Sequence, residues 1–455
     1  MKGKRACTWQ SVRCLTHILP NLFTKNNSGE HIECLDFPCL FEYTFRVDTT
    51  FLSTTYIPVD HPEPQLIPFE PLQEYRRLFP HTEQGIIYLN HAAVSPLSTR
   101  VLRAQVGHLQ DRSSGKIETY FDDVKQIEET KKCIQRMINS ESIDRIAFAG
   151  NTSEALNVIA SGLDWKPGDR ILLNDQEFPS NIYPYYHLRS QGVEIDFIHC
   201  ADGRVTPELI YASLRPRTRI LAISAVQFLS GYRAELEVLG EVCRSRGILL
   251  IVDAMQAVGG VRVDVQAMKI DGMAAGAAKW QMGPQGIGFL YVSEELQARI
   301  HQKYLGWLSV ETPWDFFHFD QALSPTAARY EGGTVNIPGM WGMHAALSTL
   351  LEVGLERIES HILALSGALL GEFQQMEGVA VYSPALLHER SGIVTIIPPA
   401  DLNPEEVFNE LVRRKIYISL RGGKLRFSPH FYNTIDEVQT AASATREILK
   451  ELSRR

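Results

Sequence analysis

The sequence predicts an α/β fold in which helices cover both faces of a mostly parallel sheet and a smaller α/β domain follows. Three observations predict it. From residue 69 onward, strand-like runs alternate with amphipathic helical stretches. The strand-like runs are almost uniformly apolar, as is typical of parallel strands buried on both faces. Near EGGTVNIPGM (331–340) this alternation breaks, and shorter elements continue to the end of the chain.

These features divide the chain into three parts. Residues 1–68 lack sustained periodicity and end in the proline-rich VDHPEPQLIPFEP stretch, so we expect a poorly ordered N-terminal extension. Residues 69–335 form the predicted large domain, whose N-terminal segment contacts the small domain. Residues 336–455 form the predicted small domain.

The expected strands share an apolar character and a length of five to eight residues. They are GIIYL (85–89), RIAFAG (145–150), RILLND (170–175), VEIDFIHC (193–200), RILAISAV (219–226), GILLIVDA (247–254) and GIGFLYV (286–292). Between them, SEALNVIASGL and RAELEVLGEVCRSRG have helical periodicity, and the second closes with a glycine at the expected C-terminal position. In the small domain, MWGMHAALSTLLEVGLERI predicts one long helix.

Composition restricts the function classes. The 455 residues are 44% hydrophobic and 22% charged, with a net charge of −8, which argues against nucleic-acid or polybasic membrane binding. No apolar run is long enough to span a bilayer. The seven cysteines include no CxxC pair, so we expect no metal site, and their spacing fits free thiols in the cytoplasm.

Lys279 stands out in DGMAAGAAKWQMGPQGIGFLYV, where small and apolar residues precede it and a glycine-punctuated turn follows. Burying an ammonium group is costly, and converting it into an imine relieves that cost. The alternative is a lysine whose ammonium reaches the surface past small neighbours. This stretch alone leaves both interpretations open.

Other candidate residues follow the expected strands, where ligands bind in parallel sheets. Thr152 and Ser153 lie at a predicted helix start, a place suited to phosphate, although an ordinary capping box fits equally. Phe178 follows the third run as a stacking surface or as a core phenylalanine. Asp253 ends a very apolar strand, with Gln256 three residues later, and either meets a bound cation or caps a helix. No Walker motif and no ordered GxGxxG occurs, so a nucleotide-binding enzyme has little support.

Taken in order, these motifs resemble the class V branch of the fold-type I pyridoxal-phosphate enzymes. That branch contains cysteine desulfurases, selenocysteine lyases, kynureninases and isopenicillin N epimerase-like proteins. The resemblance runs from YLNHAAVSPLS, beginning at Tyr88, to the YNT of FSPHFYNTIDEV. It implies a large domain with a seven-stranded sheet that binds pyridoxal 5'-phosphate, and a homodimer with shared active sites.

The resemblance also implies roles for single residues. Lys279 forms the aldimine with the cofactor, Asp253 keeps the pyridine nitrogen protonated, and Gln256 donates to the phenolic oxygen. Thr152 and Ser153 bind the phosphate, and Phe178 stacks on the ring. Thr334, in YEGGTVN, reaches the phosphate from the other subunit. Arg426 binds the substrate carboxylate, with Arg421 as the rival for that role; a surface charge is the alternative for either arginine.

Departures from the family pattern narrow the reaction. Phe178 and Phe228 replace a histidine and an asparagine of desulfurases, and Ala278 replaces a histidine or tyrosine. ISLRGGKLRFS carries no persulfide-forming cysteine. The sequence therefore predicts an enzyme that acts on an amino acid as an aminotransferase or epimerase, with a desulfurase, selenocysteine lyase or kynureninase-like lyase as alternatives. A non-catalytic binding protein with the same fold is the alternative outside this class.

Overall fold

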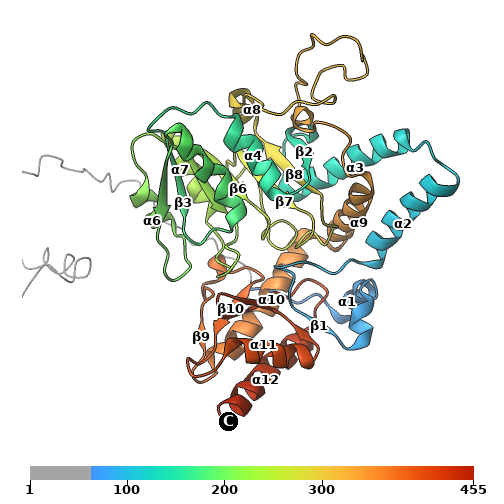
Figure 1. Ribbon diagram of the computed structural model, residues 1–455. Helices are drawn as coiled ribbons and strands as arrows, with labels where there is room; N and C mark the ends of the chain where they lie inside the picture. Colours follow the sequence, from blue (N-terminus) through green and yellow to red (C-terminus); the bar gives the residue numbers. More distant parts are fainter. Residues whose placement is uncertain (1–62, 455) are drawn as a thin grey trace, which may run out of the picture. The chain divides into compact units, whose positions relative to one another are not determined.

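The computed structural model describes residues 63–454, and a seven-stranded sheet lies at its centre (Figure 1). The strands are β2 (Ile146–Ala149), β3 (Arg170–Asn174), β4 (Glu194–Ile198), β5 (Thr218–Ser224), β6 (Leu249–Asp253), β7 (Gly272–Gly276) and β8 (Gly288–Val292). Their order across the sheet is β2-β8-β7-β6-β5-β3-β4. The pairs β3–β4, β3–β5, β5–β6 and β6–β7 are parallel, whereas β8 runs antiparallel to both its neighbours. The predicted fold class is confirmed.

Helices lie on both faces of this sheet because successive side chains of a buried strand point to opposite sides. In β3, Ile171 and Leu173 pack in one apolar cluster, and Leu172 packs in another. The first cluster includes side chains of α4 (Thr152–Gly162) and α8 (Glu294–Arg299). The second includes side chains of α3 (Tyr120–Ile138), α7 (Leu236–Arg246) and α9 (Ile337–Val353).

The remaining helices are shorter or lie away from the large sheet. They are α1 (Phe69–Arg76), α2 (Thr99–Ser114), α5 (Tyr183–Tyr186), α6 (Pro207–Ser213), α10 (Leu355–Gln374), α11 (Pro404–Arg413) and α12 (Ile435–Leu452). Gly247 follows α7 in the left-handed conformation, with φ 65°. The predicted glycine C-cap is therefore confirmed.

The sequence indicates a strand-like run between Asp253 and Lys279 but does not delimit it, because the strand found there, β7, reads GMAAG and has no β-branched or aromatic residue. Packing explains this composition. A Cβ added at Gly272 would lie 2.6 Å from the Ile159 side chain of α4. At Gly276 it would lie 3.1 Å from Met255 Sδ. Small residues let the strand approach the helix and the loop that cover it.

The first expected strand, 85–89, does not belong to the large sheet. Only Ile87 and Tyr88 form a strand, β1, and it pairs in parallel with β11 (Ile416–Tyr417). The prediction failed because an isolated apolar run does not show which partner it pairs with. This pairing joins the segment before α2 to the C-terminal part of the chain.

A second sheet has four strands in the order β12-β13-β10-β9. They are β9 (Ala380–Val381), β10 (Val394–Ile397), β12 (Ser419–Arg421) and β13 (Lys424–Phe427). Side chains of α10, α11 and α12 share one apolar cluster with it. The described residues, 63–454, belong to one compact unit, and the division at residues 335 and 336 stays a prediction.

The long helix predicted over residues 340–358 is two helices. α9 ends at Val353 and α10 begins at Leu355, with Gly354 between them at φ 95°. A glycine interrupts helical hydrogen bonding here because it adopts positive φ without a steric penalty. The apolar periodicity continued across Gly354 and concealed the break.

The folded region also begins earlier than expected. Ile67 is buried, and its amide donates to His361 Nδ1 at 2.8 Å. The Gln65 amide donates to Ser360 Oγ at 2.6 Å. Residues 63–68 therefore contact the folded chain, whereas the rest of the predicted extension, residues 1–62, lies outside the described residues.

Candidate active site

A cavity of about 370 Å³ opens where several strands of the large sheet end. Ser224 ends β5, Asp253 ends β6 and Gly276 ends β7, and all three line this cavity. Six predicted site residues also line it: Thr152, Ser153, Phe178, Asp253, Gln256 and Lys279. These residues lie far apart in sequence, and the crossover connections of a parallel sheet bring them together.

The turn that carries Lys279 is held by backbone and side-chain contacts. The Met282 amide donates to the carbonyl of Lys279 at 2.9 Å, and the Ser95 hydroxyl donates to the same carbonyl at 2.5 Å. The Ser95 amide donates to the carbonyl of Ala278 at 2.8 Å. The YLNHAAVSPLS segment therefore lies directly against the lysine turn.

Lys279 is half-buried, and its Nζ lies 5.5 Å from the centre of the Phe178 ring. Burial lowers the pKa of this amine. The nearby charges of Arg426 and Arg421 lower it as well, whereas Asp253 opposes them. A lowered amine pKa increases the fraction of the neutral, nucleophilic form at neutral pH.

Asp253 is 4% exposed, and its Oδ1 accepts the amide hydrogen of Met255 at 2.9 Å. Within residues 63–454, no lysine, arginine or histidine nitrogen lies within 4 Å of its carboxylate. Burial raises the pKa of Asp253, and the nearby Glu177 charge raises it further. Asp253 and Lys279 thus line one cavity as oppositely charged groups that do not form an ion pair.

The hydrogen bonds at the start of α4 show which residues cap the helix and which remain free to bind a phosphate. Asn151 is the N-cap residue, and its side chain accepts the Glu154 amide at 2.9 Å. The Glu154 side chain accepts the Gly150 amide, also at 2.9 Å. Asn151 and Glu154 therefore do the capping expected of Thr152 or Ser153. Neither of those two hydroxyls has a protein partner in the described part of the chain.

Phe178 is 43% exposed and borders the cavity, so it is not the core phenylalanine that the alternative predicted. Its ring meets that of Phe228 edge to face, with centroids 5.4 Å apart. The exposed part of the ring therefore offers a stacking surface to a flat ligand in the cavity.

Gln256 has one amide hydrogen and its oxygen engaged by protein. Its Nε2 donates to the carbonyl of Ala92 at 3.0 Å, and its Oε1 accepts the indole N–H of Trp280 at 2.8 Å. An amide nitrogen carries two hydrogens, so one remains for a ligand. These contacts fix the side chain behind the lysine turn.

The two candidate arginines differ in burial. Arg426, on β13, is 2% exposed, and its Nη1 donates to the carbonyl of Phe228 at 2.6 Å. Its Nε is buried without a partner, and no carboxylate of the described residues lies within 4 Å of this guanidinium. Arg421 is exposed, and its side chain donates to the carbonyl of Leu420 at 3.3 Å. Neither arginine lines the cavity itself, but Phe228 connects Arg426 to it.

Thr334 lies apart from the other candidates. It lines a neighbouring cavity of about 250 Å³ that shares Gly150, Gly286 and Ile287 with the Lys279 cavity. Its predicted contact comes from a second subunit, so it stays a prediction.

Sequence reasoning missed three residues at this site. Asn151 was overlooked beside Thr152, although asparagine is a preferred N-cap. Ser224 pairs with Asp253 in register and lines the cavity. Glu177 is a buried carboxylate directly before Phe178, and its position after a strand was a usable signal.

These residues fit pyridoxal phosphate group by group. An anionic phosphate suits the free hydroxyls of Thr152 and Ser153 at a helix N-terminus. A protonated pyridine nitrogen would supply the cation that Asp253 lacks, and the aldehyde suits the Lys279 amine. Phe178 offers a surface for the ring.

The comparisons with known proteins agree with this geometry. The sequence profile described as aminotransferase class-V matches residues 87–440. The chain belongs to the aminotransferase class-V family. It is therefore an enzyme that depends on pyridoxal phosphate, and the predicted resemblance and cofactor are confirmed.

Several class-V relatives span most of the chain. A probable cysteine desulfurase of Pyrococcus abyssi is 30% identical over 84% of this chain and 98% of its own. One of Methanothermobacter thermautotrophicus is 28% identical, covering 80% of this chain and 94% of its own. Among solved structures, the apo cysteine desulfurase of Thermococcus onnurineus has a TM-score of 0.76 at 26% identity, covering 86% of this chain and 100% of that one.

The three cysteines among residues 63–454 are poor candidates for sulfur transfer in this class-V enzyme. Cys133, Cys200 and Cys243 are all buried free thiols. Burial raises the pKa of each, to about 11 for Cys200 and about 12 for Cys243. Within the same residues, no helix is both long and apolar enough to cross a membrane.

Proposed function

We propose that this enzyme holds pyridoxal phosphate on Lys279 and converts an amino acid by an aminotransferase-like or epimerase-like reaction. The observation that carries the proposal is a half-buried lysine and a buried aspartate that line one cavity without pairing. When bound, the cofactor supplies an electron sink for a carbanion at the substrate α-carbon. Lys279 is then the group placed to take up and return the α-proton.

Arg426 is the proposed partner of the substrate carboxylate. A buried guanidinium without an anionic partner is unfavourable, and an incoming carboxylate satisfies it through a charge-assisted pair. Arg421 is exposed to solvent, so its guanidinium does not need a bound carboxylate to offset burial. We therefore assign the carboxylate to Arg426 rather than to Arg421.

Cysteine desulfuration is the second candidate because both curated relatives above, and the solved Thermococcus structure, are named for it. The differences between this chain and the desulfurase pattern argue against desulfuration. The turn from Arg421 to Lys424 carries no thiol, and the three described thiols are buried. Cys7, Cys14, Cys34 and Cys39 lie outside the described residues.

A panel of amino acids in deuterated buffer tests the reaction. We expect spectral shifts with a responding amino acid, together with oxo-acid formation or exchange at its α-carbon. We expect negligible sulfide from L-cysteine. Turnover of cysteine to alanine that is lost on replacing one particular cysteine would restore the desulfurase assignment.

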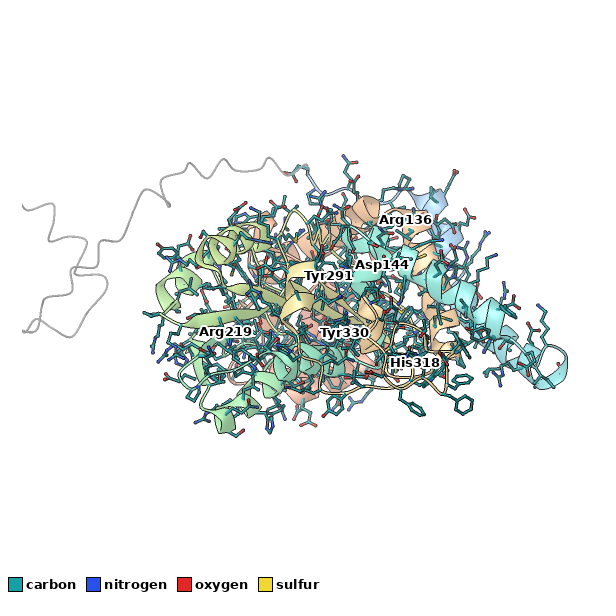
Figure 2. The ribbon with its side chains drawn as sticks, turned by 90° about the horizontal axis from the view of Figure 1, so that it is seen from above. Arg136, Asp144, Arg219, Tyr291, His318 and Tyr330 are labelled. Carbon is teal, nitrogen blue, oxygen red and sulfur yellow. The ribbon has the colours of Figure 1, made fainter. Side chains whose placement is uncertain are left out.

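We also propose a homodimer with shared sites. On α2, Leu102, Val106 and Leu109 recur at helical spacing, and all three are exposed. Aromatic side chains at positions 304, 307, 314, 316, 317 and 319 are exposed as well. Figure 2 shows His318, within this segment, at the edge of the molecule. Such apolar surface is typical of an interface, and a second copy would bring Thr334 to the phosphate.

Mass measurement in solution tests the dimer. We expect twice the 51.3 kDa of one chain, and replacement of Leu102 and Leu109 by lysine is expected to shift the mass toward one chain. A wild-type protein that is a stable monomer and still holds the cofactor would contradict this proposal.

The buried free thiols also support the expected cytoplasmic location, since unpaired cysteines persist in reducing compartments.

A further inference from the structure

Glu177 is a buried carboxylate that is not one of the proposed cofactor ligands. It is 7% exposed, and within residues 63–454 no lysine, arginine or histidine nitrogen lies within 4 Å of it. A buried carboxylate without a cation is costly unless hydrogen bonds replace the lost water. Its surroundings must therefore supply donors.

Five hydrogen bonds do so. Oε1 accepts from Asn174 Nδ2 at 2.6 Å, the Ser224 amide at 2.8 Å and Gln227 Nε2 at 2.9 Å. Oε2 accepts from Ser224 Oγ at 2.5 Å and Asn181 Nδ2 at 3.0 Å. An ionised carboxylate offers about four lone-pair positions, so both oxygens are saturated.

The carboxylate of Glu177 orients the side-chain amides of Asn181 and Gln227. Asn181 and Gln227 turn their nitrogens to Glu177, and the oxygens of both are buried without a partner. Unpaired buried oxygens are unfavourable, so the bonds to Glu177 determine the orientation.

The donors belong to two segments on different strands. Asn174 ends β3, and Asn181 lies in the short 3-10 turn Pro179–Asn181, so Phe178 lies between them. Ser224 ends β5, and Gln227 directly precedes Phe228. Phe178, Ser224 and Phe228 all line the Lys279 cavity. One carboxylate therefore joins the segments that carry both cavity phenylalanines.

We propose that Glu177 is a positioning residue of this enzyme, whose carboxylate fixes the Phe178 and Phe228 rings against the cofactor ring. This inference rests on the proposed function. Glu177 does not line the cavity and acts through its neighbours. Its negative charge also adds to the field at Asp253.

Glu177→Gln tests this role with little change in shape. The new amide nitrogen cannot accept a hydrogen bond, so the donors that faced the replaced oxygen, Ser224 Oγ and Asn181 Nδ2 if that oxygen is Oε2, must turn around or lose their partner. We expect the dissociation constant for pyridoxal phosphate added to the apoprotein to be at least fivefold larger than in the wild-type protein. The visible circular dichroism of the bound cofactor should also decrease, because it reports a fixed ring orientation.

Asp271→Asn is the matched control. Asp271 is also a buried carboxylate of this sheet, and it accepts the Leu250 amide at 2.8 Å, away from the cavity. We expect it to lower thermal stability and to leave the dissociation constant and the dichroic signal unchanged. Equal effects of both variants on cofactor binding, or a Glu177→Gln protein that binds like wild type, would overturn the inference.

Gln227→Met decides the question if Glu177→Gln does not fold, because it removes one donor and keeps the carboxylate. We expect a smaller loss of dichroic signal in the same direction, and an unchanged signal would overturn the inference. Wild-type protein that takes up no cofactor would overturn the proposed function as well. If only the positioning role is wrong, the wild-type protein still binds the cofactor and is yellow, so the two failures can be distinguished.

Discussion

The amine of Lys279 lies over the ring of Phe178, with Nζ 5.5 Å from the ring centre. The two residues come from loops after different strands, and the cavity lies at their meeting point. A planar cofactor bound through Lys279 would therefore have an aromatic surface beside it.

Phe178→Ala should weaken cofactor binding without abolishing it. Aromatic stacking contributes about 0.5 to 1.5 kcal/mol, which corresponds to a factor of roughly 2 to 12 in the dissociation constant. Titration of the apoprotein with pyridoxal phosphate measures this. Phe178→Tyr should restore binding, and Tyr186→Ala, at an exposed position of α5 that does not line the cavity, should have no effect. Unchanged affinity in Phe178→Ala would remove the stacking role.

Arg426→Ala should weaken binding of the responding amino acid and leave cofactor binding nearly unchanged. Removing one member of a buried charge pair costs about 2 to 5 kcal/mol, because the substrate carboxylate is left unpaired. The loss should appear in kcat/KM. Arg421→Ala is the comparison, and its effect should be small because Arg421 is exposed. A larger loss in Arg421→Ala would reverse the assignment.

Stability should fall in mild acid because three histidines are buried. Burial lowers the pKa of His430 to about 4, that of His91 well below its usual value, and that of His361. Since the unfolded chain binds protons near pH 6.5, their contribution is present above that pH and is lost as pH falls toward 4. For His430 alone the loss approaches roughly 3 kcal/mol.

Urea unfolding at pH 7.5, 6 and 5 checks this prediction. His430 Nδ1 accepts the Phe431 amide, and its Nε2 donates to the carbonyl of Trp280. His430→Gln retains a donor and an acceptor without titrating in this range, so it should reduce the acid dependence. His199→Gln, at an exposed position, should leave the dependence unchanged. A free energy of unfolding that is constant across these pH values would contradict the account.

The sequence predicted candidate site residues best where a polar or charged side chain follows an apolar strand. Asp253 and Lys279 were recognisable because charged groups in apolar stretches need a reason to be there. Glu177 was missed because its donors lie up to 50 residues away, so its hydrogen bonds depend on the completed sheet. The break at Gly354 was missed because apolar periodicity does not report a positive φ. The bounds of β7 were not predicted because GMAAG has a low strand propensity that tertiary packing overrides.

Borohydride reduction of the purified enzyme tests the central claim most directly. The protein should be yellow, bleach on reduction, and carry the cofactor label on the peptide containing Lys279. Lys279→Ala should lose the visible band, whereas Lys269→Ala, whose lysine forms an ion pair with Glu241, should keep it. A colourless protein that takes up no added cofactor, or a label on another lysine, would contradict the account.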